Sequence, residues 1–225
     1  MFVINKMDEN LKRFVNKGIS PIGIHETIYH QEQKTLIVVG VARGGTSLIS
    51  GALQHLGVFT GDMSSSPVFE DVRLAAPMDK KKFPQAGAII NEYNERYSTW
   101  AFKRPSIIHC LDDMHEIWRN PFYLFVFKDI ASIANRNVLS MGMDFEKCLF
   151  HAQKSYGLIT HFLSSNKNIN GIAFSFEKLL DNKEYFLEQL ISIIGSEITS
   201  DQINSANKFI TSNPELYLDK SRIVK

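Results

Sequence analysis

The sequence predicts a three-layer α/β/α protein built around a mainly parallel β-sheet. Short apolar runs alternate with amphipathic segments along the 225 residues, and the clearest apolar run leads directly into a glycine-rich loop and a helical pattern. The sequence shows no internal repeat and no low-complexity tract. Strands that alternate with helices are joined by right-handed crossovers, which place helices on both faces of a parallel sheet.

The first strand, loop and helix are predicted within residues 35–57. Residues 35–39, with the sequence TLIVV, form a β-branched apolar run that is typical of a strand buried on both faces. Residues 47–56 place apolar side chains on one stripe at helical spacing, and Gly57 supplies a stop signal. The stripe consists of Leu48, Ile49, Ala52, Leu53 and Leu56.

The segments on either side of this unit have weaker patterns. Residues 1–33 are polar and mixed, with a helix expected at 9–16 and a loop at 18–23. Residues 60–86 are rich in Ser, Pro and Lys and are expected to be irregular. A brief strand is predicted at residues 106–109.

The second half of the sequence continues the alternation. Residues 122–127 (FYLFVF) predict a strand and residues 131–140 the helix that follows it. Asp144 is expected to cap a longer helix, and residues 171–176 (GIAFSF) predict another strand. The apolar stripe of the longer helix is Phe145, Cys148, Leu149, Ala152, Tyr156, Ile159 and Leu163.

A last helix is expected to begin at a capping box formed by Asp181 and Glu184 and to end at Gly195. Its inward residues would be Phe186, Leu187, Leu190, Ile191 and Ile194. We therefore expect one domain, because no linker interrupts the pattern. Its parts would be an N-terminal extension at 1–33, a core at about 35–195, and a C-terminal helix and tail at 196–225.

Charge and composition exclude several classes of protein. With 25 Lys and Arg against 24 Asp and Glu, the formal net charge is +1, so no overall field recruits nucleic acid or an acidic membrane. The two cysteines, Cys110 and Cys148, form neither a metal-type pair nor a disulfide framework. No apolar stretch approaches the roughly 20 residues of a transmembrane segment. Asp8 and Glu9 come too early for a secretory signal, so a cytoplasmic protein is expected.

The glycine-rich loop is predicted to bind an anion. The segment GVARGGTS nearly matches the G-x-x-x-x-G-K-[ST] frame of loops that hold ATP phosphates, but Thr46 replaces the lysine and Arg43 supplies a cation three residues earlier. Backbone N–H groups between a buried strand and a helix would point into one concavity. The alternative is that the glycines only turn the chain. The candidate anion-binding residues are Arg43, Gly44, Gly45, Thr46 and Ser47.

The loop resembles the 5′-phosphosulfate loop of sulfotransferases that use 3′-phosphoadenosine-5′-phosphosulfate (PAPS). Their pattern G-x-[PA]-[KR]-[SG]-G-T-[ST]-[LW] is matched by GVARGGTSL. The resemblance implies a P-loop NTPase-like fold, PAPS as co-substrate and no bound metal. A kinase lysine works beside Mg²⁺ on the β- and γ-phosphates. PAPS has one phosphate and one sulfate at its 5′ end, so a basic residue within the loop would suffice.

A second segment resembles the family's 3′-phosphate motif, R-[DN]-P-x-x-x-x-x-S. In FVFKDIASIANRN, Lys128 stands at the arginine position and Ile130 replaces the proline. Arg136 stands where the motif has serine, and Ser132 lies one helical turn before it, on the same face. The resemblance implies that Lys128, Ser132 and Arg136 hold the 3′-phosphate. The alternative is that Lys128 ends an edge strand and Arg136 is a solvated helix residue.

Further resemblances point to catalytic candidates. Sulfuryl transfer needs an in-line acceptor, a base and cations over the developing charge. Arg43 and Lys103 are the candidate cations, and Lys103 lies in WAFKRPS, which resembles the W-G-x-K-D-P-R segment of bacterial members with Arg104 in place of the aspartate. Glu70 in PVFEDVRL resembles an acceptor-side F-E-D/S segment, and His109 in SIIHC resembles the histidine base of cytosolic members.

Each base candidate also has a purely structural reading, as a solvated glutamate or a packed histidine. Nearby, Asp112, Asp113 and His115 fit an exposed helical turn better than a metal site. The segment SFEKLLDNKEYFLEQLISIIG resembles a mainly structural Y-E-D-L element of the family, whereas the carboxy-terminal R-K-G-x-x-G-x-W element is absent.

The resemblance implies a sulfotransferase that acts on a hydroxyl acceptor. A sugar or lipid-linked glycan is the acceptor class it points to, because bacterial members commonly serve surface polysaccharides. A P-loop kinase-like phosphotransferase is the enzyme alternative, but the loop lysine is missing and no aspartate is clearly placed to hold Mg²⁺. A degenerate member that binds nucleotide without transfer is the third reading. The sequence predicts neither the acceptor's identity nor the oligomeric state.

Overall fold

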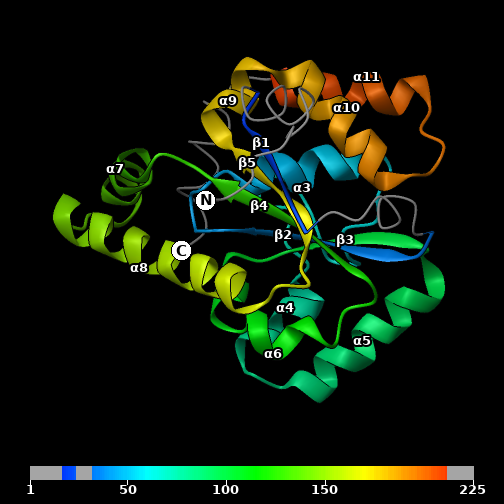
Figure 1. Cartoon of the computed structure of the whole chain (residues 1–225), viewed down its shortest axis with the longest axis horizontal. Coiled ribbons are helices and arrows are strands. Elements are labelled where there is room, and N and C mark those ends of the chain that lie inside the picture. The colour runs from blue at the N-terminus through cyan, green and yellow to red at the C-terminus, as the bar shows by residue number, and fades with distance from the viewer. Residues whose placement is uncertain (1–16, 24–31, 212–225) are drawn as a thin grey trace, which may run out of the picture.

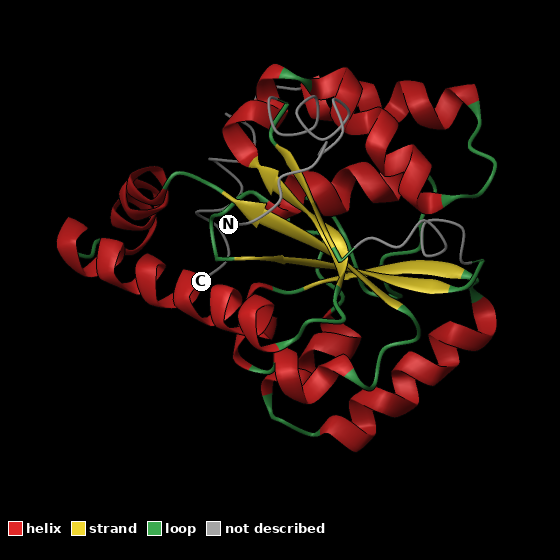
Figure 2. Cartoon of the chain, in the orientation of Figure 1, coloured by secondary structure: helices red, strands yellow, loops and turns green. Residues whose placement is uncertain are grey.

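A five-stranded β-sheet with helices on both faces forms the centre of the molecule in the computed structural model, which describes residues 17–23 and 32–211 (Figures 1 and 2). The strand order is β1-β5-β4-β2-β3, with β1 antiparallel to β5 and the other neighbours parallel. The predicted fold class is confirmed. The strands are β1 (Ile19–Ile22), β2 (Lys34–Gly40), β3 (Thr99–Lys103), β4 (Pro121–Phe127) and β5 (Asn170–Ser175).

Two layers of helices enclose the sheet. One layer packs α3, α10 and α11 against one face, and the other packs α4, α5, α6 and α8 against the opposite face (Figure 1). The helices are α3 (Thr46–His55), α4 (Val72–Asp79), α5 (Phe83–Arg96), the 3-10 helix η1 (Pro105–His109), α6 (Leu111–His115), α7 (Ile130–Met141), α8 (Phe145–Ser165), α9 (Phe176–Asp181), α10 (Lys183–Ile194) and α11 (Ser200–Thr211).

Strand β2 lies inside the sheet and is buried along its whole length. Because successive side chains point to opposite faces, Leu36 and Val38 belong to the core beneath α3 and α10. Ile37 and Val39 belong to the core beneath α5 and α8. The continuous apolar run TLIVV is thus explained by burial on both faces, as predicted.

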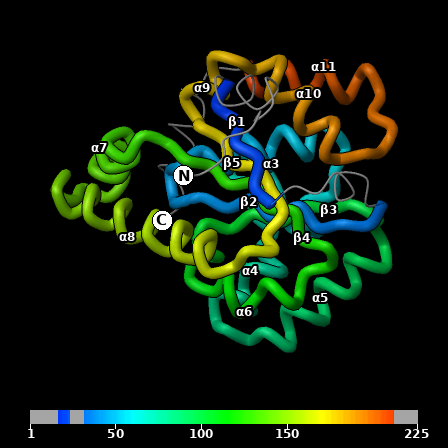
Figure 3. Tube along the Cα trace, in the orientation of Figure 1, coloured from blue at the N-terminus to red at the C-terminus, as the bar shows by residue number. Residues whose placement is uncertain are grey.

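The path of the chain reverses direction across the sheet at β2 (Figure 3). After β2 the chain builds β3 on one side and then crosses to β4 on the other side. Gly40, at the end of β2, lies opposite Val126 near the end of β4. In open α/β sheets such a switch point leaves a crevice at the carboxyl ends of the strands, where ligands bind. The fold therefore places the glycine-rich loop and the β4–α7 turn side by side.

Several elements match the sequence predictions closely. Strands β2, β4 and β5 and helices α3, α7 and α8 begin and end within a residue or two of the predicted limits. Asp144 holds the N-cap position of α8, but its carboxylate pairs with Lys147 at 2.7 Å and makes no cap hydrogen bond. Phe145 belongs to the predicted apolar stripe of α8 but is exposed. Phe162 was not part of the predicted stripe but is buried.

The strand predicted at 106–109 is wrong, because these residues lie in η1. Pro105 begins η1, a position where a backbone N–H has no partner within the helix, so proline loses nothing there. The Ile107 N–H donates to the Arg104 carbonyl at 3.0 Å. The strand of this region is β3, which ends at Lys103. The apolar run SII therefore packs as a helical turn.

The prediction that residues 60–86 are irregular is also wrong, because they contain α4 and the start of α5. Asp71 caps α4 by accepting the Arg73 N–H at 3.1 Å. Pro77 lies inside this short helix and interrupts the helical pattern of the sequence.

Two predictions at the ends of the chain differ as well. The loop expected at 18–23 contains β1, in which Pro21 is tolerated because β1 is an edge strand. The capping box at Asp181 and Glu184 is wrong, since Asp181 ends α9 and Asn182 holds the N-cap position of α10. The helix predicted at 9–16 lies outside the described residues.

Candidate active site

The glycine-rich loop connects β2 to α3 at the carboxyl edge of the sheet. Arg43 and Gly45 both have left-handed backbone angles, with φ values of 65° and 90°. A Cβ at Gly45 would lie 2.2 Å from the ring of Phe176, so this position fits only glycine. Helix α3 begins at the buried Thr46, and its first N–H groups have no carbonyl partner within the helix. The loop thus leads directly into the N-terminus of α3, where the first N–H groups and the helix dipole favour negative charge.

Lys103 ends β3 and reaches across to this loop. Its side chain is only 2% exposed. The ammonium donates to Ser47 Oγ at 3.0 Å and to Glu70 Oε1 at 2.7 Å. It also donates to the carbonyl oxygen of Val68 at 2.9 Å. Three acceptors thus satisfy all three N–H bonds of a buried ammonium, which is the condition for burying such a charge at tolerable cost.

Arg104 engages the other oxygen of the same carboxylate. Its guanidinium donates to Glu70 Oε2 and, at 2.6 Å, to Asp79 Oδ2. Ser106 Oγ donates to the second oxygen of Asp79 at 2.6 Å. Glu70 is therefore held between two cations from consecutive residues, and its own side chain is only 12% exposed.

The electrostatics of Lys103 reflect this crowding. Burial lowers the pKa of Lys103 below its ordinary value, and the nearby guanidinium groups of Arg104 and Arg43 lower it further. The Glu70 carboxylate opposes both effects. The charge of Arg43 on the loop is thus felt at Lys103 on β3.

The second predicted anchor lies at the end of β4. The backbone N–H and C=O of Lys128 are both bound by the Tyr156 hydroxyl at 2.8 Å. The Lys128 ammonium lies 4.8 Å from the centroid of the Phe176 ring. Burial lowers the pKa of Lys128, and the neighbouring charge of Arg136 lowers it further, while Glu177 and Asp129 raise it. Lys128 and Arg136 therefore form one basic region.

Two carboxylates in this region bind the backbone. Asp129 caps α7 by accepting the Ser132 N–H at 2.7 Å, and Glu177 Oε1 accepts the Asp129 N–H at 2.9 Å. The side chains of Asp129 and Glu177 thus hold the β4–α7 turn in place. Lys128 directly follows β4, which lies inside the sheet, so the reading of it as the end of an edge strand is wrong.

Phe176 joins the two regions. Its ring fills the space beside Gly45 on the loop, and the Lys128 ammonium lies over its face. In the sequence, Phe176 belongs to the strand predicted at 171–176 and to a mainly structural motif, and neither assigns it to the site. Its position directly after β5, whose neighbour is β4, was the available signal that it reaches the same sheet edge.

The predicted site residues separate into groups. Arg43, Ser47, Glu70 and Lys103 meet around the loop, and Lys128, Ser132 and Arg136 belong to the β4–α7 region. His109 is exposed at the end of η1, and no contact of the described residues joins it to Glu70 or Lys103. Arg104 was not among the predicted site residues, because in the sequence it appeared only as a departure from a motif.

The residues near His109 serve other contacts. Asp112 accepts a hydrogen bond from Asn166 at 2.9 Å, and His115 Nδ1 lies 2.7 Å from the Tyr123 hydroxyl. Within the two described ranges, no cluster of three or more His, Cys, Asp or Glu side chains is arranged to hold a metal ion. The helices found in those ranges include none with the length and apolar character needed to cross a membrane.

The structure resembles two solved sulfotransferase structures. Sulfotransferase STF9 from Mycobacterium avium superposes with a TM-score of 0.54 at 10% identity, over 81% of this chain and 69% of that one. The sulfotransferase domain of the Synechococcus PCC 7002 olefin synthase gives a TM-score of 0.52 at 16% identity, over 87% of this chain and 90% of that one. No family model and no curated protein matches the sequence. The chain thus has the fold of these bacterial sulfotransferases.

Proposed function

We propose that the protein is a sulfotransferase that moves a sulfuryl group from PAPS to a hydroxyl acceptor. The observation that carries this proposal is the buried Lys103 ammonium, which touches Ser47 of the glycine-rich loop on one side and Glu70 on the other. One cation therefore stands between a loop suited to an anion and a carboxylate suited to accept a proton. The fold shared with solved sulfotransferases supports the same reaction.

The residues around the loop would divide the chemistry between them. Arg43 and the N–H groups at the start of α3 would hold the 5′ phosphosulfate. The acceptor oxygen would bond to sulfur as the bond from sulfur to the bridging phosphate oxygen breaks, and 3′-phosphoadenosine-5′-phosphate would leave with the electron pair. Lys103 would offset the charge that develops on the leaving phosphate.

Glu70 would take the proton of the acceptor hydroxyl. Each carboxylate oxygen offers more than one lone pair, so the contacts with Lys103 and Arg104 leave room for a further hydrogen bond. Both contacts also fix the direction of the carboxylate, which a general base needs. His109 lacks such support, because its side chain is exposed at the end of η1.

The β4–α7 region would bind the 3′-phosphate of the donor. Lys128, Arg136 and the Ser132 hydroxyl would contact it, as the family motif implies. Phe176 lies between this region and the loop, where it is suited to support the adenosine that joins the two anions. A sugar or glycan hydroxyl is the acceptor class that we propose.

Transfer of labelled sulfate from PAPS to a panel of glycans tests the proposal directly. A parallel competition titration compares 3′-phosphoadenosine-5′-phosphate, AMP and Mg·ATP. We expect sulfated product without added metal, and affinity in the order just given. Metal-dependent ATP turnover, or tighter binding of Mg·ATP, would instead identify a kinase. Tight binding of the bisphosphate with no transfer to any acceptor would identify a protein that only binds nucleotide.

A further inference from the structure

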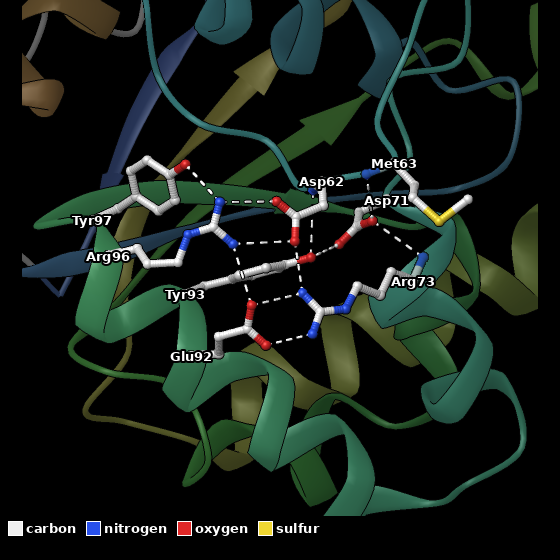
Figure 4. Close-up of polar contacts among 8 residues, drawn as sticks. All are labelled: Asp62, Met63, Asp71, Arg73, Glu92, Tyr93, Arg96 and Tyr97. Atoms are coloured by element: carbon white, nitrogen blue, oxygen red, sulfur yellow. Dashed lines mark hydrogen bonds and ion pairs between the residues drawn. The ribbon is translucent and has the colours of Figure 1, made fainter.

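The residue after Glu70 is a fully buried carboxylate. Asp71 is 0% exposed, and its Oδ1 accepts the backbone N–H groups of Met63 at 3.2 Å and Arg73 at 3.1 Å (Figure 4). Its other oxygen, Oδ2, accepts the hydroxyl of Tyr93 on α5 at 2.7 Å. Asp71 therefore ties the loop that carries Glu70 both to the start of α4 and to a second helix.

The chain closes tightly around this carboxylate. Gly61 has a φ of 118°, and a Cβ there would lie 2.2 Å from Cβ of Asp71 and 2.4 Å from its Cγ. Only glycine permits this backbone angle and this close approach. The position of Asp71 is consequently fixed by contacts on several sides.

The residues before Glu70 are fixed to the glycine-rich loop helix. Ser47 Oγ donates to the Val68 carbonyl at 3.1 Å, and Ser50 Oγ donates to the Phe69 carbonyl at 3.2 Å. Phe69 has a left-handed φ of 55°, which costs energy in a residue other than glycine and persists only where surrounding contacts impose it. Glu70 is thus the one residue between an anchor on α3 and an anchor on α5.

We propose that Asp71 and Tyr93 are positioning residues that set the direction of the Glu70 carboxylate and thereby the rate of transfer. This inference rests on the proposed role of Glu70 as the base. Neither residue needs to touch the donor or the acceptor. Their contact acts through Glu70 by limiting how far it moves from Lys103.

The two oxygens of Asp71 have separate tasks, which makes the inference testable. Oδ1 caps α4, whereas Oδ2 serves Tyr93. Tyr93→Phe removes the second contact and leaves the helix cap and the aromatic ring in place. It also removes the longer bond that the Asp62 N–H donates to the Tyr93 hydroxyl at 3.4 Å. Burial and the hydrogen bond to Asp71 raise the pKa of Tyr93, so the hydroxyl stays protonated and donates across the working range.

Tyr97 provides a matched control on the same helix region. Its hydroxyl accepts a hydrogen bond from Arg96 at 3.1 Å, and Arg96 pairs in turn with Asp62 (Figure 4). Tyr97→Phe therefore removes a hydroxyl from the outer, more exposed part of the same network. Exposed ion pairs of this kind contribute little to stability.

The experiment measures kcat and the donor KM for both variants, each in the wild-type and in the Glu70→Gln background. Tyr93→Phe should lower kcat about 5- to 10-fold, as expected for the loss of the short buried hydrogen bond to Asp71, with the donor KM unchanged. In the Glu70→Gln background the same substitution should have no further effect on kcat, because positioning no longer matters. Tyr97→Phe should match its parent in both backgrounds.

Hydrogen exchange gives a readout that does not need activity. Backbone N–H groups of residues 63–71, a range that leaves out the Asp62 N–H bound directly by Tyr93, should exchange faster in Tyr93→Phe than in Tyr97→Phe. Equal exchange in the two variants, or an equal loss of kcat in both Glu70 backgrounds, would overturn the positioning role. A Glu70→Gln enzyme with full activity would instead overturn the proposed base, and this outcome is visible without either tyrosine variant.

Discussion

The two basic regions at the carboxyl edge of the sheet are built differently. Around the glycine-rich loop, Lys103 is buried with three protein acceptors and a paired carboxylate. At the β4–α7 turn, the ammonium of Lys128 lies over the ring of Phe176 and forms no salt bridge within residues 17–23 and 32–211. The charge of the first region is neutralised by protein groups, whereas we propose that the cation of the second region meets a ligand. We therefore expect the first to govern chemistry and the second to govern affinity and selectivity.

The difference also appears in how carboxylates are used. Glu70 binds cationic side chains, whereas Asp129 and Glu177 bind backbone N–H groups. Preorganised charge in a water-poor site is the largest contribution to rate in many enzymes. Charge that meets a ligand at a partly exposed edge contributes mainly to binding.

The largest expected effect comes from Glu70, the proposed base. Glu70→Gln should lower the transfer rate by about 10²–10⁴-fold while nucleotide affinity stays near wild type. His109→Ala should transfer sulfate at the wild-type rate, because its side chain lies outside the network of Lys103 and Glu70. Initial rates with labelled PAPS and calorimetry with the bisphosphate product measure both quantities. Full activity of Glu70→Gln together with a slow His109→Ala would reverse the assignment.

Glu70→Gln also removes the partner of a buried cation, and breaking such a pair costs about 3–5 kcal/mol of stability. Glu70→Asp is the companion variant, since it keeps the charge near Lys103 and shortens the reach of the carboxylate. If Glu70→Asp is stable and slow, the loss of rate reflects geometry at the reacting centre. Thermal unfolding of both variants separates the two effects.

The second effect concerns the β4–α7 region. Removal of the donor's 3′-phosphate should weaken binding by about 30- to 1,000-fold, which corresponds to about 2–4 kcal/mol. Lys128→Ala should bind 3′-phosphoadenosine-5′-phosphate and AMP with more nearly equal affinity and leave kcat at saturating donor almost unchanged. Lys147→Ala, which removes an exposed lysine of α8, is the control. A wild-type protein that binds both nucleotides equally would refute the 3′ assignment.

The third effect concerns the loop cation. Arg43→Ala should weaken binding of the bisphosphate by about 1.5–3 kcal/mol, the range for a hydrogen bond to a charged group. Unlike Lys128→Ala, Arg43→Ala should weaken the binding of AMP as much as the binding of the bisphosphate, because AMP keeps the 5′ phosphate. Calorimetric titration of both nucleotides makes the comparison. Unchanged affinity and turnover would remove Arg43 from the site.

The sequence was sufficient for the parts of this site that follow from local order. The run TLIVV, the glycines after it and the helical stripe after those placed the loop correctly, because buried strands and helix starts leave local patterns. Lys103 was proposed as a catalytic cation from a motif resemblance, and the strand predicted nearby, at 106–109, lies several residues after the observed β3. Pro105 made the following SII run a helical turn, which periodicity alone does not reveal.

Contacts between distant residues left no such pattern. Asp71 and Tyr93 are 22 positions apart, and Lys103 and Ser47 are 56 apart. The neighbouring residues in the sequence do not distinguish any of these side chains from one on a solvated loop or helix. Gly45 carried a partial signal, since its missing side chain makes room for Phe176, but the sequence does not name the residue that fills the space.

The smallest expected effect is a pH dependence of selectivity. Burial lowers the pKa of Lys128 below the ordinary 10.5, so the free protein loses this charge at a lower pH than a solvated lysine does. The donor's 3′-phosphate, with a second pKa of about 6, remains a dianion from about pH 7 upward. The bound phosphate favours the ammonium over the neutral amine. Preference for the 3′-phosphate is therefore complete below the pKa of Lys128 and declines as the pH rises through it.

The measurement is the ratio of AMP to bisphosphate dissociation constants between about pH 7 and about pH 10, which should fall by up to about tenfold per pH unit once Lys128 deprotonates. Because AMP shares the 5′ phosphate and the adenosine, the ratio cancels titration of the loop. Lys128→Arg is the matched variant, since a guanidinium stays charged throughout this range and should keep the ratio constant. A wild-type ratio as constant as that of Lys128→Arg would show that Lys128 does not contact the 3′-phosphate.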